Sequence, residues 1–88
     1  MFREAIKCND GTTISIQASS SHYCTPKEDK LPLTEYTHYE LGFPSKEIPC
    51  LLEYSEDIEC LTSTVYPYVP KAIVKEALDY CGGADLVL

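Results

Sequence analysis

The sequence has no tryptophan, a single methionine, few basic residues and no long apolar run. A helix that crosses a bilayer needs roughly 20 mostly apolar residues, so no membrane span is expected. Surfaces that bind nucleic acids or anionic membranes need positive charge, and 7 basic against 14 acidic residues argue against both as direct partners. The net charge of −7 favours a protein partner with a basic surface.

The first seven residues, MFREAIK, lack the apolar core of a secretory signal peptide, so we expect a cytoplasmic protein. The 88 residues are enough for a single domain, residues 1–88. At this size folding buries only roughly 60–65% of the surface of the chain, which leaves a thin core. Such small domains often depend on a metal, a disulfide or a second subunit for stability.

The hydrophobic pattern predicts an α+β fold, an antiparallel sheet of about four strands with one C-terminal helix packed on it. Asp10-Gly11 suits a tight hairpin turn, because glycine adopts positive φ angles readily. After this turn Ile14 and Ile16 alternate with polar residues, which places Gln17 on a solvated face. The expected strands span residues 2–7, 12–18, 33–43 and 63–68.

Residues 70–80 carry the clearest helical signal. Pro70 suits the first helical position, and Gly82-Gly83 supplies a C-terminal stop. A single apolar stripe at helical spacing should pack on the sheet; it consists of Ile73, Val74, Ala77, Leu78 and Cys81. The last five residues have no assigned structure, and a long polar loop spans residues 19–33.

Five cysteines are an odd number, so a complete disulfide framework would leave one thiol over. His22 and Cys24 point the same way in an extended segment, and with Cys60 and Cys81 they form a candidate tetrahedral zinc set. Cys50 is the reserve ligand. The alternative is that the cysteines are small buried apolar side chains, as free cysteines usually are.

A thiol nucleophile is a further alternative for the same residues. Cys24 or Cys81 would need activation by His22 or His38, but Cys81 follows a helix whose dipole opposes a thiolate. The sequence offers no evident third group to orient either histidine, and no glycine-rich phosphate loop or nucleophile elbow. We therefore expect no catalytic residues and no enzyme activity.

Acidic residues are concentrated in one short stretch, and the chain is rich in tyrosine. The stretch can bind a basic groove in competition with nucleic-acid phosphates, and tyrosines are frequent at binding surfaces. The alternative is a solvated loop of no special role. The predicted partner-binding residues are Glu53, Tyr54, Glu56, Asp57 and Glu59.

Several segments resemble a family of small proteins from phages and prophages. The similarity covers about residues 20–83 and is carried by HYCTP at 22–26, YELGFPS at 39–45, YSED at 54–57, TVYPYVP at 64–70 and Gly82-Gly83. Small acidic phage proteins of this kind include anti-CRISPR proteins, some of which act on Cas9 and bind zinc.

The resemblance implies a type II-A anti-CRISPR in the cytoplasm of a bacterial host, which binds Cas9 and blocks its DNA loading or cleavage. It transfers no catalytic residues, and its HYC segment coincides with the candidate zinc ligands His22 and Cys24. The alternative is a zinc-stabilised structural or regulatory phage protein, a homodimer with no defence target.

Overall fold

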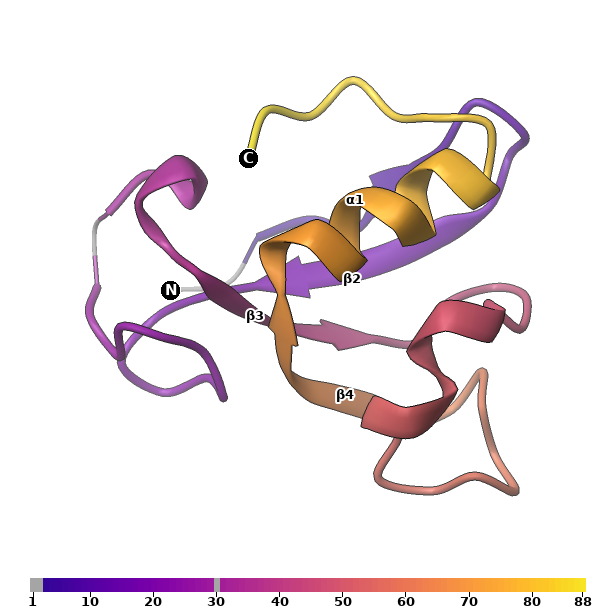
Figure 1. Cartoon of the computed structure of the whole chain (residues 1–88), viewed down its shortest axis with the longest axis horizontal. Helices are drawn as coiled ribbons and strands as arrows, with labels where there is room; N and C mark the ends of the chain where they lie inside the picture. Colours follow the sequence, from indigo (N-terminus) through magenta and orange to yellow (C-terminus); the bar gives the residue numbers. More distant parts are fainter. Residues whose placement is uncertain (1–2, 30) are drawn as a thin grey trace.

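The computed structural model describes residues 3–29 and 31–88 and confirms a small α+β fold. An antiparallel sheet in the order β1-β2-β3-β4 is followed by a C-terminal helix (Figure 1). Along the chain the elements are β1 (Ile6–Lys7), β2 (Thr13–Gln17), the 3-10 turn η1 (Leu33–Glu35), β3 (His38–Gly42), the 3-10 helix η2 (Pro49–Tyr54), β4 (Val65–Pro70) and α1 (Lys71–Tyr80).

The first three strands are shorter than the sequence suggests, whereas β4 has the predicted length and begins two residues later than expected. The first predicted strand reduces to β1, and its residue Phe2 lies outside the described residues. Strand β3 pairs with β2 through Ile16 and Leu41, and with β4 through Tyr39 and Val69. A β-bulge interrupts the second pairing, where Pro67 and Tyr68 lie opposite Glu40. Proline is tolerated there because β4 is an edge strand at a bulge.

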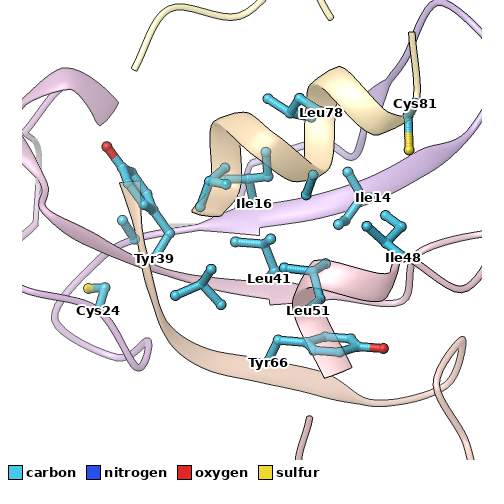
Figure 2. Packing of buried hydrophobic residues seen from close by; sticks show 14 of the residues in the cluster. Ile14, Ile16, Cys24, Tyr39, Leu41, Ile48, Leu51, Tyr66, Leu78 and Cys81 are labelled. Atoms are coloured by element: carbon cyan, nitrogen blue, oxygen red, sulfur yellow. The ribbon is translucent and has the colours of Figure 1, made fainter. Parts of the chain in front are cut away.

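The core lies between the sheet and α1, which packs against η2, β3 and β4. Figure 2 shows the apolar side chains of β2 and β3 beneath the helix, with Leu51 of η2 beside them. The apolar stripe of the helix faces this core as predicted, with Val74, Ala77 and Leu78 buried. The largest fully buried side chains include Tyr36, Tyr39, Tyr66, Ile14, Ile16, Leu41, Ile48, Leu51, Val69 and Val74.

Tyr36 departs from the predicted strand over residues 33–43. Pro32 precedes the 3-10 turn η1, and Tyr36 comes directly after that turn. Its ring is fully buried, and its hydroxyl donates a hydrogen bond to the carbonyl of Glu28. The strand therefore begins five residues later than predicted, at His38, and the Tyr36 ring is buried with its hydroxyl paired before the strand starts.

Gln17 was expected on a solvated face, and this expectation is wrong. The side chain is buried beneath the N-terminal segment, where its Oε1 accepts a hydrogen bond from the Arg3 N–H at 2.8 Å. Its Nε2 donates to the Arg3 carbonyl at 2.6 Å and to Ser15 Oγ at 3.0 Å. A buried amide costs little when its donors and acceptor are paired in this way.

The helix ends as the two glycines predict. The N–H of Gly83 donates to the Leu78 carbonyl at 2.8 Å and that of Gly82 to the Asp79 carbonyl at 3.0 Å, with φ of +88° and +85°. This is a Schellman motif, which satisfies the last carbonyls of a helix. Beyond it the tail runs back past α1 (Figure 1), and Ala84, Leu86 and Leu88 pack against the core.

Leu51 and Leu52 provide a matched test of this packing, because they are adjacent in η2 and differ in burial, 0% against 37% exposed. We expect Leu51→Ala to lower the free energy of unfolding by about 2–5 kcal/mol, because it leaves a cavity in the core. Leu52→Ala should change it by less than about 1 kcal/mol. Urea denaturation of both variants measures the difference, and equal losses would contradict the packing of η2.

Candidate functional site

The acidic loop, as we call residues 53–59 with their carboxylates Glu53, Glu56, Asp57 and Glu59, starts at the end of η2 and leads towards β4. All four acidic residues are exposed. The loop is nevertheless attached to the sheet, because the Glu56 N–H donates to the Val65 carbonyl at 3.2 Å. Local turns also fix the backbone, with the Glu59 N–H donating to Asp57 Oδ1 at 3.0 Å. The carboxylates are therefore presented to solvent from an ordered backbone.

Within the described part of the chain, none of these four carboxylates forms an ion pair. Between residues of the described ranges 3–29 and 31–88, the ion pair that forms joins Lys46 Nζ to Asp10 Oδ2 at 2.6 Å, and it involves none of the loop carboxylates. Four carboxylates so close in sequence repel one another in part, and a basic partner would relieve that repulsion. The electrostatics of the loop are suited to a positively charged protein surface.

Exposed apolar side chains lie within and beside the acidic loop, and the sequence analysis missed them. Ile58 is 67% exposed between two of the carboxylates. Phe43 is 57% exposed and has a φ of +50°, unusual for a bulky residue. Its N–H donates to the Thr64 carbonyl at 3.0 Å, beside the strand to which the loop is attached. The only sequence signal for these residues was an isolated apolar residue in a polar segment, as at Asp57-Ile58-Glu59.

The tyrosines divide between the core and the surface. Tyr36, Tyr39 and Tyr66 are buried, and burial raises the pKa of Tyr39 to about 12, so they are structural. Tyr54, predicted to contact the partner, is half-buried beside the core. Tyr68 is exposed.

A separate aromatic pair, which is not part of the predicted set, lies on the surface. The rings of Tyr23 and Tyr68 are exposed, with centroids 5.9 Å apart, and Lys27 Nζ lies 5.0 Å from the Tyr23 ring centroid. The backbone builds this pair, because the Tyr68 N–H donates to the Tyr23 carbonyl at 3.1 Å while Tyr68 adopts a φ of +53°. The Tyr23 N–H in turn donates to Glu40 Oε1 at 3.0 Å.

The four predicted zinc ligands are not gathered by the fold. Figure 2 shows Cys24 and Cys81 at opposite ends of the labelled core. Both are buried, whereas Cys60 is exposed in the loop before β4. Within residues 3–29 and 31–88, no three His, Cys, Asp or Glu side chains are grouped so that they could hold a metal ion. The arrangement does not fit the proposed ligand set, and zinc stays a prediction that metal analysis must test.

The thiol and imidazole groups have hydrogen-bond partners of other kinds. Cys24 Sγ lies 3.1 Å from the Ser19 carbonyl oxygen and 3.3 Å from that of Pro26, and burial raises its pKa. His22 Nδ1 lies 2.7 Å from Ser19 Oγ, and His38 Nδ1 lies 2.9 Å from Thr37 Oγ1. A raised pKa keeps the Cys24 thiol protonated near neutral pH, which lowers its reactivity as a nucleophile.

A hollow lies between α1 and the tail, with a volume of about 260 Å³. Its lining is formed by the apolar residues Leu78, Ala84, Leu86 and Leu88 together with Lys75, Asp79 and Gly83. It is small beside the cavities of about 300–1,000 Å³ that hold most small ligands. None of the predicted site residues lines it.

Comparisons with protein-family models, with curated proteins and with solved structures give no match to this chain. In the described ranges, no helix combines the length and apolar character needed to span a membrane. The function of this chain is therefore inferred from its own residues, above all from those of the acidic loop.

Cys24 and Cys60 provide a matched test of the zinc set. From the structure we expect Cys24→Ala to lower the free energy of unfolding by about 1–3 kcal/mol, because it removes a buried thiol and its hydrogen bonds. Cys60→Ala should change it by less than about 0.5 kcal/mol, because the side chain is exposed. A zinc ion shared by both residues instead predicts similar losses, one zinc per chain by mass spectrometry, and a melting temperature that falls with a chelator.

Proposed function

We propose that this chain is a non-catalytic protein inhibitor from a phage or mobile element, which uses the acidic loop to bind a basic surface of Cas9. The observation that carries the proposal is that the four loop carboxylates are exposed on an ordered backbone with no ion-pair partner among the described residues. The resemblance to small phage proteins suggests the identity of the partner. Occupation of that surface would block DNA loading or cleavage.

The chemistry of such a complex follows from charge and from one apolar contact. A groove that holds nucleic acid is lined by lysine and arginine, so a surface of carboxylates competes with the phosphates for the same side chains. Complementary charge accelerates association and fixes orientation more than it adds affinity. Ile58, the most exposed apolar side chain among the carboxylates, would supply the desolvated contact that binding energy requires.

Inhibition of DNA cleavage by Cas9 tests the proposal. We expect cleavage to fall as the purified chain is added before DNA, and to recover as salt is raised, because screening weakens an electrostatic complex. Full cleavage at a large excess of the chain would exclude Cas9 as the partner. Self-association on light scattering together with full cleavage would favour the structural or regulatory alternative.

Two variants with the same net charge distinguish a specific effect of the acidic loop from an effect of the net charge of the chain. One changes Glu53, Glu56 and Glu59 to Gln and Asp57 to Asn; the other makes the same changes at Glu4, Glu28, Glu35 and Asp85, all exposed elsewhere. We expect the loop variant to bind Cas9 at least about tenfold more weakly, and the control variant to bind within about threefold of the parent. Equal weakening of both would show that only net charge matters. Titration calorimetry gives the dissociation constants.

A further inference from the structure

We propose that Cys8 and Cys81 form a disulfide under oxidising conditions, which fastens the β1–β2 hairpin to the end of α1 and makes the stability of the chain sensitive to redox conditions. Both thiols are free and buried in the structure. They come from nearly opposite ends of the sequence, and the fold brings them together.

The backbone holds the two cysteines close to each other. The residues after Cys8 bind the end of the helix directly, since the Asn9 N–H donates to the Gly83 carbonyl at 2.8 Å and the Asp10 N–H to the Cys81 carbonyl at 3.1 Å. Asn9 Nδ2 adds a bond of 2.9 Å to the Gly82 carbonyl.

The glycines at the helix end allow the hairpin turn to approach the helix closely. A Cβ added at Gly82 would lie 3.4 Å from the Asp10 nitrogen, and one at Gly83 would lie 3.3 Å from Asn9 Nδ2. The hairpin turn therefore fits closely against the helix end. In Figure 2 the sulfur of Cys81 points from the end of α1 towards the sheet.

The side chains of the two cysteines interact as the backbone contacts imply. Burial raises the pKa of Cys8 to about 11, and the charge and hydrogen bond of the neighbouring Cys81 thiol are the next causes. The carboxylate of Asp10 raises this pKa further, whereas Lys46 lowers it. Cys8 is therefore protonated in the folded chain near neutral pH, and it becomes a thiolate only as the pH rises towards 11 or when the hairpin opens.

A low-molecular-weight disulfide, written RSSR, is the oxidant. The thiolate of one cysteine attacks RSSR to form a protein–S–SR mixed disulfide, and RS⁻ leaves and takes up a proton. The second protein thiol loses its proton and attacks the protein sulfur of that mixed disulfide, which releases a second RSH. Two protein thiols are oxidised to one disulfide, and one RSSR is reduced to two RSH.

The other cysteines do not compete well for this bond. Cys24 lies at the opposite end of the core (Figure 2), and Cys60 is exposed in the loop before β4. Cys50 is the nearest rival, because it is close enough to Cys81 for their charges to interact. Its Sγ, however, is directed at the Ile73 carbonyl oxygen, 3.9 Å away.

The test refolds the reduced full-length chain from urea in a mixture of oxidised and reduced glutathione, so that burial does not limit access. Alkylation and peptide mass mapping then identify the linked cysteines. We expect a Cys8–Cys81 bond and a melting temperature about 10 °C or more above that of the reduced chain, because the bond closes a long loop in the unfolded state.

Variants make the assignment specific. Cys8→Ala should abolish the rise in melting temperature, whereas Cys60→Ala and Cys50→Ala should keep it. Cys81→Ala should also abolish the rise. If that variant is too unstable to give a clear melting transition, the result for Cys8→Ala decides whether this bond causes the rise. A bond from Cys81 to Cys50, a bond that includes Cys60, or recovery of five free thiols at every glutathione ratio would overturn the proposal.

Discussion

Strand β3 lies between β2 and β4, and the burial of Tyr39 and Leu41 on one of its faces is the contact on which the remaining structure depends. These side chains form the surface against which α1 packs, and Leu51 of η2 joins them (Figure 2). Because so small a domain has a thin core, each element must contribute to the same cluster. The acidic loop is positioned as a result, since it extends from η2 and hydrogen-bonds to the first residue of β4.

The fold class, the hairpin of β1 and β2, and the helix were predictable from the sequence because each leaves a local pattern. Ile14 and Ile16 alternate with polar residues, Val74 and Leu78 recur at helical spacing, and two glycines end the helix. The positions of Tyr36 and Gln17 were not predictable in this way. Their burial depends on the Glu28 carbonyl and on the backbone of Arg3, and hydrogen bonds between such distant residues leave no periodic signal.

The candidate site was predictable in its charge but not in its shape. The carboxylates of the acidic loop were evident from composition, whereas the exposure of Phe43 and Ile58 depends on backbone geometry. Spacing placed His22 and Cys24 together, but it carried no information on where Cys60 and Cys81 would lie after folding. The contact of Cys8 with Cys81 joins the two ends of the chain and depends equally on the complete fold.

Hydrogen–deuterium exchange of the chain, with and without Cas9, tests the central claim that the acidic loop is the binding surface. The account predicts slower exchange over residues 52–59 and over the adjoining residues 43–45 in the complex, with the tail and the Asn9–Gly11 turn unchanged. Unchanged exchange across the loop, at a concentration where Cas9 is inhibited, would contradict it. Slower exchange only at Tyr23, Tyr68 and their neighbours would instead show that the exposed tyrosines form the binding surface.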